Sequence, residues 1–127
     1  MKWRTSKYRA EKITFDGITF ASKKEGMRYV VLKQQEKDGL ISNLRLQVPY
    51  ELIPAIYKDE EKQLKTKSKM VRKLVQRAVH YVADFVYDKD GETIVEDVKG
   101  GRATQTAEYK LKKKMMLALK GIQIKEV

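Results

Sequence analysis

Two apolar runs on either side of a short polar segment constrain the fold of this chain most strongly. The runs are residues 75–87 and 92–99, and the segment between them is Asp88-Lys89-Asp90-Gly91. Apolar runs of this length that flank a turn containing Asp-Gly are typical of two paired β-strands. Successive side chains of a strand point to opposite faces, so residues two apart share a face. The sequence therefore predicts a β-hairpin and the face on which each of its side chains lies.

Three charged residues of this hairpin form a candidate catalytic group. Asp97 and Lys99 are two residues apart on the second strand, so they share a face and lie about 7 Å apart along the backbone. Asp84 lies among apolar neighbours on the first strand, where a charge is costly unless it has a partner or a metal. We expect Asp84 to share a face with Val82 and Val86. The other face is expected to hold Tyr81, Ala83, Phe85 and Tyr87. Two carboxylates that hold a hard cation, with an ammonium beside them, suit metal-assisted cleavage of a phosphodiester.

Simpler interpretations of the same residues remain open. Asp97 and Lys99 can be solvent-facing charges on a half-exposed strand, and Asp84 can form a cross-strand ion pair with Lys99. Glu96 points to the opposite face from Asp97, so we expect a lesser role for it. His80 is the single histidine, and we interpret it as a packed strand residue rather than a ligand or base.

The first third of the chain predicts a hairpin and a helix. Asp16-Gly17 separates two short apolar pieces within residues 13–20, which indicates a tight hairpin. Residues 22–38 have helical spacing of apolar side chains, with Ser22 as the N-cap. Glu25 stands three residues after Ser22, as in a capping box, and this role would explain Glu25 without any catalytic function.

The middle of the chain is less regular. Residues 40–53 are apolar and partly alternating, and Pro49 and Pro54 favour an edge strand or a bend. Residues 58–73 are rich in lysine, and their periodicity leaves open a long β-ribbon, a flap or a short helix.

The C-terminal part predicts a helix and a last strand. Thr104 or Thr106 can cap a helix that runs to about Leu119, and residues 122–127 alternate as a short strand. The order hairpin, helix, three strands, helix, strand predicts an α/β fold with a mixed sheet flanked by two helices. At 127 residues the chain is expected to form a single domain, 1–127, with residues 1–11 as a basic arm.

The charge balance indicates a polyanionic partner. There are 28 Lys plus Arg and 17 Asp plus Glu, which gives a formal net charge of +11. We expect nucleic acid rather than a membrane, because no long apolar stretch is present. With no cysteine and one histidine, thiolate and multi-histidine zinc sites are excluded. Any metal must be held mostly by oxygen, which suits Mg²⁺ or Mn²⁺, and the absence of cysteine is compatible with a cytoplasmic location.

Basic side chains suggest where a nucleic acid could bind. The candidates before and on the C-terminal helix are Arg102, Lys110, Lys113 and Lys114, and those in the 58–73 segment are Lys69 and Arg72. A lysine-rich helix face that serves only solubility is the alternative. No zinc finger, helix-turn-helix or aromatic RNA-binding motif is visible, so recognition of shape through the backbone is expected.

Several short phrases of the chain resemble those of a known superfamily. They are Ser22-Lys23-Lys24-Glu25, Ile41-Ser42-Asn43-Leu44 with Leu46-Gln47, Tyr81-Val82-Ala83-Asp84-Phe85, Val95-Glu96-Asp97-Val98-Lys99-Gly100 and Tyr109-Lys110-Leu111-Lys112-Lys113-Lys114. Together they resemble small phage and prophage endonucleases within the PD-(D/E)XK nuclease superfamily. The first motif here is Ala83-Asp84 instead of Pro-Asp.

The resemblance carries expectations for fold, site and activity. It implies a restriction-endonuclease-like αβββαβ core, with Glu25, Asp84 and Asp97 as metal ligands and Lys99 as the catalytic lysine. It also implies Mg²⁺-dependent cleavage of DNA in company with Holliday-junction resolvases, in phage recombination, replication or packaging, in the cytoplasm of the host. Symmetric cleavage of branched DNA requires two active sites, so we expect a homodimer. A non-catalytic nucleic-acid binder on the same scaffold, or an RNA nuclease, is the alternative.

Overall fold

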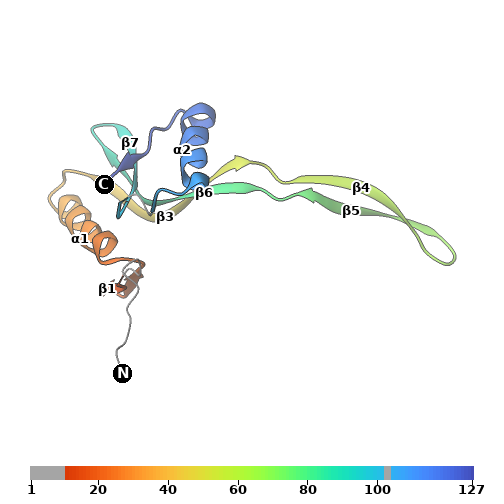
Figure 1. Ribbon diagram of the computed structural model, residues 1–127, viewed down its shortest axis with the longest axis horizontal. Coiled ribbons are helices and arrows are strands. Elements are labelled where there is room, and N and C mark those ends of the chain that lie inside the picture. The colour runs from red at the N-terminus through yellow and green to blue at the C-terminus, as the bar shows by residue number, and fades with distance from the viewer. Residues whose placement is uncertain (1–10, 102–103) are drawn as a thin grey trace, which may run out of the picture.

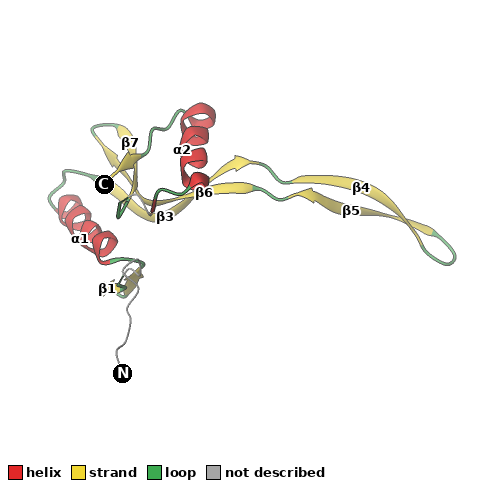
Figure 2. Cartoon of the chain, in the orientation of Figure 1, coloured by secondary structure: helices red, strands yellow, loops and turns green. Residues whose placement is uncertain are grey.

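The computed structural model describes residues 11–101 and 104–127 (Figure 1). The basic arm, apart from its last residue, and Arg102 lie outside the described residues. The elements in chain order are β1 (Ile13–Phe15), β2 (Ile18–Phe20), α1 (Lys23–Lys37), β3 (Ser42–Ile53), β4 (Ile56–Gln63), β5 (Ser68–Gln76), β6 (Val79–Lys89), β7 (Glu92–Asp97), α2 (Ala107–Lys120) and β8 (Lys125–Glu126). They form an α/β fold with a mixed four-stranded sheet, two helices and an N-terminal hairpin (Figure 2), which confirms the expected class.

The central sheet has the strand order β3-β6-β7-β8. The pairs β3–β6 and β6–β7 are antiparallel, whereas β8 runs parallel to β7 after the crossover through α2. Without the β4–β5 ribbon, the order of elements after the first hairpin is αβββαβ, as expected. Strand β3 lies at the edge of the sheet, where Pro49 is tolerated because its missing N–H breaks no ladder in the interior of the sheet.

The central hairpin differs from the prediction at its ends. Its turn has only two residues, Asp90 and Gly91, with φ of 52° and 79°. Positive φ at both positions is the geometry that joins twisted strands most tightly, and Asp-Gly supplies it at low cost. Asp88 and Lys89, expected in the turn, belong to β6. The first run is also divided, because Val75 belongs to β5, which ends at Gln76, and β6 begins only at Val79.

Two hydrophobic clusters lie on opposite faces of β7, where Ile94 joins one cluster and Val95 the other. The α1 cluster has as its buried members Phe20, Tyr29, Leu32, Ile41, Phe85 and Tyr87. The α2 cluster has as its buried members Leu52, Tyr81, Ala83, Val86, Val95, Tyr109, Met116 and Ile124. Each helix therefore covers its own face of the sheet, with α1 and α2 apart in Figure 1.

Strands β3 and β6 both change face at the same level. On β6, Ala83 packs in the α2 cluster and Phe85 in the α1 cluster, although regular alternation would put them together. On β3, Leu46 joins the α1 cluster and Val48 the α2 cluster. The expectation that Ala83 and Phe85 share a face is therefore wrong. The cause is local: Gln47, between Leu46 and Val48, has φ of 50°, which breaks the pleat.

The helix ends follow the predicted signals. The Oγ atom of Ser22 accepts a hydrogen bond from the Glu25 N–H, and the Oγ1 atom of Thr106 accepts one from the Tyr109 N–H. Gly121, with φ of 67°, closes α2 in the left-handed conformation. Of the two predicted caps of this helix, Thr106 is therefore the one used.

The lysine-rich segment forms a ribbon of two antiparallel strands, β4 and β5, which projects from the sheet (Figure 1). Of the three conformations left open by the sequence, the β-ribbon is the one adopted. None of the helices in the described ranges is long and apolar enough to cross a membrane.

Candidate active site

Glu25 reaches the site from the first turn of α1. Its backbone N–H is bound by Ser22, as in a capping box, but its carboxylate accepts a hydrogen bond from Gln47 Nε2 at 3.2 Å. Glu25 is 9% exposed. The cap therefore explains where the helix begins, and it leaves the buried carboxylate for another purpose.

Gln47 connects Glu25 to Asp84. The same Nε2 atom donates to Asp84 Oδ1 at 3.2 Å, which uses both amide protons. The two carboxylate oxygens are therefore no more than twice that distance apart. Gln47 has a left-handed backbone and lies between Leu46 and Val48, which pair with Phe85 and Ala83 where the strands change face.

The second oxygen of Asp84 is fixed by the next strand. Asp84 Oδ2 accepts a hydrogen bond from the Val98 N–H at 2.9 Å, just beyond the end of β7. The carboxylate is thus held at both oxygens, by a side-chain amide from β3 and by the backbone after β7. The partners of Asp84 are therefore Gln47 and Val98. The interpretation of an Asp84–Lys99 ion pair is wrong, because Lys99 pairs with Asp97 instead.

Asp97 and Lys99 form an ion pair on the α2 side of the sheet. The Lys99 Nζ atom lies 3.1 Å from Asp97 Oδ1 and 3.5 Å from the centre of the Tyr109 ring. The Tyr81 hydroxyl donates to Asp97 Oδ2 at 2.6 Å. Asp97 is 6% exposed and the Lys99 side chain 14% exposed. These charges are therefore mostly buried, which contradicts the interpretation as solvent-facing charges.

The environment raises the pKa of Asp84 and of Glu25. Burial raises the pKa of Asp84 to about 7 although the Val98 N–H lowers it, and the neighbouring Asp97 and Glu25 carboxylates add to the rise. Burial, followed by the charge of Asp97, also raises the pKa of Glu25 above its ordinary value. Three acids thus interact in one region with a single lysine ion-paired to one of them, an arrangement that a bound cation would relieve.

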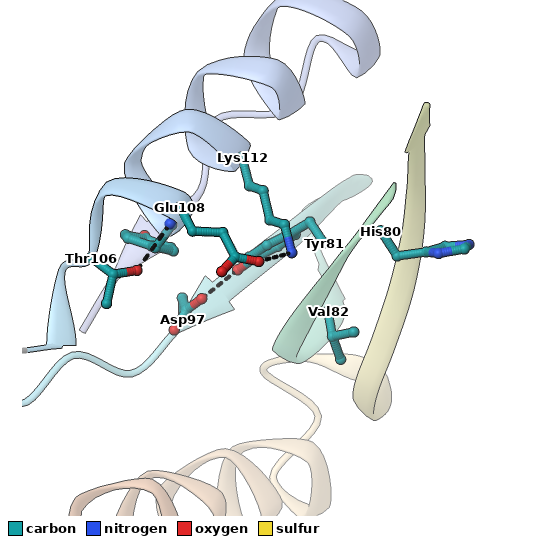
Figure 3. Close-up of a pocket in the computed structure, with 8 residues that line it drawn as sticks. His80, Tyr81, Val82, Asp97, Thr106, Glu108 and Lys112 are labelled. Carbon is teal, nitrogen blue, oxygen red and sulfur yellow. Dashed lines mark hydrogen bonds and ion pairs between the residues drawn. The ribbon is translucent and has the colours of Figure 1, made fainter. Parts of the chain in front are cut away.

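The carboxylates lie along two hollows. Glu25, Gln47 and Asp84 line a pocket of about 440 Å³ beside β2. Asp97 lines a second pocket of about 290 Å³ beneath α2. Figure 3 shows Asp97 and Tyr81 directed toward each other in the second pocket, with Lys112 and Glu108 paired above them. Within residues 11–101 and 104–127, no three acidic or histidine side chains converge as a complete metal-holding group.

These residues nevertheless fit a hard divalent cation by their chemistry. All three candidates are carboxylates, and Mg²⁺ prefers oxygen ligands while it keeps several water molecules. Glu25 and Asp84 share one amide and one hollow, so they can act together. His80 is exposed and points away from Asp97 in Figure 3, so the prediction that it is packed is wrong. It lies on β6 opposite Glu51 of the edge strand.

Glu96 points to the face of β7 opposite Asp97, as expected, and its contacts are with α1 and β6. It is fully buried on the α1 side, where Arg28 donates Nε to Oε1 at 2.8 Å and Nη2 to Oε2 at 2.7 Å. The Tyr87 hydroxyl also donates to it. Burial raises the pKa of Glu96, but the hydrogen bonds from Arg28 and Tyr87 outweigh it, so the pKa is below the ordinary value. Glu96 therefore joins α1 to the sheet.

Comparison with known proteins gives a family and no activity. A family model described as "Protein of unknown function (DUF1064)" matches residues 5–126. The chain belongs to the DUF1064 family. No curated protein and no solved structure matches it. The matched range includes every candidate residue above.

The predicted nucleic-acid contacts fall in separate places. Lys110, Lys113 and Lys114 line a hollow of about 340 Å³ on α2, and Lys113 is ion-paired with Glu126. Lys69 and Arg72 are on β5, far along the ribbon. Arg102 lies outside the described residues.

Sequence reasoning gave no role to Gln47 or Tyr81. Both bond directly to the acids, Gln47 to Glu25 and Asp84, and Tyr81 to Asp97. Gln47 occurs in the phrase Leu46-Gln47, but a polar residue between alternating apolar ones is ordinary in a strand. No local signal distinguishes it, because its contacts depend on the pairing of β3 with β6.

Proposed function

We propose that this DUF1064 protein is a metal-dependent endonuclease that hydrolyses phosphodiester bonds of DNA and prefers branched substrates. The observation that carries the proposal is the shared amide of Gln47, which ties the buried Glu25 to the partly buried Asp84, one strand away from the Asp97–Lys99 pair. Buried carboxylates without enough positive partners are costly, so a role in binding a cation accounts for their presence. The formal net charge of +11 supports a nucleic acid as substrate.

Each residue has a distinct part in the proposed reaction. Glu25, Asp84 and Asp97 would hold the cation, and Gln47 and the Val98 N–H orient Asp84. The cation, when bound, neutralises charge on the scissile phosphate and lowers the pKa of a bound water. The Tyr81 hydroxyl keeps Asp97 oriented.

Lys99 supplies the positive charge nearest to the acids. Its Nζ atom contacts Asp97 and the face of Tyr109, so its position is fixed on two sides. From there the ammonium can orient the attacking water or stabilise charge that develops on the phosphate oxygens. The absence of a base-reading motif favours recognition of DNA shape, and two copies would be needed to cut a symmetric branch.

The test compares a labelled four-way junction, a linear duplex of the same sequence and a matched RNA, each with and without Mg²⁺. We expect cleavage of the junction that requires Mg²⁺ and is abolished by EDTA. Asp84→Asn and Asp97→Asn should each reduce the rate at least about a hundredfold, since even loss of groups that only orient metal ligands costs up to that much.

Asp90→Asn is the matched control. It makes the same chemical change in the exposed turn of the same hairpin, and Asn tolerates the positive φ there. It should cut like the wild type. If no substrate is cut in Mg²⁺ or Mn²⁺ by a folded protein, or if Asp97→Asn and the wild type cut equally, the proposal fails. Cleavage of the RNA alone would replace DNA by RNA as the substrate.

A further inference from the structure

The β4–β5 ribbon is an arm whose surface is almost entirely free. All its residues from Ile56 to Gln76 are exposed except Glu60 and Val71, which are partly exposed. Figure 1 shows it extending away from the helices and the sheet. A two-stranded ribbon without packing on a core is only marginally stable in water. An exposed arm of this length is therefore suited to binding another molecule.

The pairing of the two strands separates the charges onto two faces. Residues directly opposite each other in an antiparallel pair lie on the same face. One face holds the opposite pairs Lys58↔Lys73 and Lys62↔Lys69, with Glu60↔Val71 between them. We call it the lysine face, and its cations are Lys58, Lys62, Lys69 and Lys73.

The other face is not basic. Its opposite pairs are Tyr57↔Leu74, Asp59↔Arg72, Glu61↔Met70 and Gln63↔Ser68. The Arg72 guanidinium lies 3.9 Å from the centre of the Tyr57 ring, so its cation is already engaged there. Of the two ribbon residues predicted to bind nucleic acid, Lys69 is on the lysine face and Arg72 on the opposite one.

The lysine face is arranged at a cost to the ribbon itself. Like charges directly opposite each other destabilise a pair of strands, and this face has two such lysine pairs. Glu60 offsets one of them through its contact with Lys73 at 3.4 Å, but no such contact joins Lys62 or Lys69 to an acid among the described residues. The opposite face pairs unlike charges, Asp59 with Arg72. A ligand with closely spaced negative charges would remove the repulsion.

We infer that the lysine face of the ribbon binds the phosphate backbone of duplex DNA away from the cleavage site. A two-stranded ribbon fits the width of the major groove, and lysine acts on phosphates as a point charge. The inference rests on the proposed function only for the choice of DNA as the polyanion. It adds a second, non-catalytic contact to that function.

The proposed DNA contact lies far from the acids, but the ribbon that makes it is a continuation of the two strands at the site. The ribbon continues β3 beyond Pro54 and returns into β6, and Gln47 and Asp84 lie on these strands. Lys58 is eleven residues from Gln47 and Lys62 fifteen, or about 36 and 50 Å along an extended chain. These lengths are the greatest possible separations, and one turn of duplex is about 34 Å, so the ribbon would engage DNA up to about one and a half turns from the cut.

The experiment measures binding without catalysis. Fluorescence anisotropy of a labelled 30-base-pair duplex is recorded in EDTA at several salt concentrations, for the full chain. The test variant is Lys62→Gln/Lys69→Gln. The control is Lys37→Gln/Lys89→Gln, which removes the same charge from exposed residues of α1 and β6.

The lysine face predicts a specific loss for the test variant. Two phosphate contacts fewer should reduce the slope of log affinity against log salt by about 1.8 and weaken binding about 60-fold at 0.1 M salt. The control should bind within about threefold of the wild type. The test substitution removes a like-charge pair, so circular dichroism should show the fold intact.

Four outcomes decide the matter. Equal losses in the two double variants, or no binding by the wild type, overturn the inference. A change of oligomeric mass in the test variant without loss of DNA affinity would assign the face to a second copy of the chain instead. A ribbon-specific loss of binding in a protein that cuts nothing would uphold the inference and refute the proposed nuclease function.

Discussion

Replacing Arg28 by methionine tests how far the buried Glu96 depends on one partner. Glu96 is 0% exposed, and the Arg28 guanidinium makes two hydrogen bonds to it, at 2.8 and 2.7 Å. Methionine keeps much of the length and apolar contact of the arginine side chain but removes its charge and its donors. Of the two side chains that donate to the Glu96 carboxylate, Arg28 and Tyr87, only the Tyr87 hydroxyl then remains.

The expected loss follows from the burial of the pair. Breaking a buried ion pair on one side costs about 3–5 kcal/mol, because the remaining charge is left without compensation. The Arg28 side chain is 23% exposed and Tyr87 remains, so we expect the lower end, about 3 kcal/mol. Arg45→Met is the control. Arg45 pairs with Asp88 at 3.8 Å, and both side chains are about 40% exposed, so the change should cost less than about 1 kcal/mol.

The assay is urea unfolding at pH 7 and at lower pH. In the wild type the lowered pKa of Glu96 contributes stability above about pH 4.3, and that stability is lost as the pH falls through the folded value. Without Arg28, burial dominates and raises the pKa of Glu96, so the folded variant takes up a proton more readily. The loss in free energy of unfolding of Arg28→Met, relative to the wild type, should therefore become smaller as the pH is lowered from 7 to 5. Glu96→Gln added to Arg28→Met should recover much of the loss. A deficit below 1 kcal/mol, or one that does not change with pH, would refute the reasoning.

Two further substitutions test the supports of the site. A Cβ at Gly26 would clash with the side chain of Ile13 on β1, so Gly26→Ala must displace that side chain, and we expect urea unfolding to show a loss of about 1–3 kcal/mol. An unchanged stability would mean that the Ile13 side chain moves aside freely. Tyr81→Phe removes the donor to the buried Asp97, and we expect a loss of about 1.5–3 kcal/mol in the same assay. A neutral effect would show that Asp97 finds another donor.

The elements that the sequence predicted well are those with local signals. Ser22 and Thr106 act on backbone groups within three residues, and Asp90-Gly91 forms a turn without help from elsewhere. These features follow from the chain's own chemistry, so their prediction needed no tertiary information. Asp84 was singled out because an acid in an apolar run needs a partner, and it does have partners, the Gln47 amide and the Val98 N–H.

The ribbon was not predictable in the same way. Strand β4 has the sequence Ile-Tyr-Lys-Asp-Glu-Glu-Lys-Gln, in which apolar and polar residues do not alternate. A strand with both faces in water has no need of such a pattern, and only its pairing with β5 reveals which charges share a face. The separation of Lys69 from Arg72 is therefore a property of the register and not of composition.

The change of face at Gln47 has a different origin. Among the described residues four non-glycine residues have positive φ, and three of them are Asp or Asn, which tolerate it. Gln47 has no such preference, and a left-handed conformation costs a residue of this kind about 1–2 kcal/mol. No residue near Gln47 indicates a left-handed backbone at this position. The prediction therefore continued the regular alternation through Asp84 and wrongly placed Ala83 and Phe85 on the same face.

That irregularity brings groups from the two faces of the sheet close together. Glu25 comes from the α1 side of the sheet, whereas Asp97 and Lys99 lie on the α2 side with Tyr81 and Tyr109. A regular sheet would separate the two sets by its own thickness. Where β3 and β6 change face, Gln47 can reach Glu25 and Asp84 together, and Asp84 can also accept from the backbone beside Asp97. The strained residue thus stands where groups from the two faces meet, which is where strain is retained when it serves function.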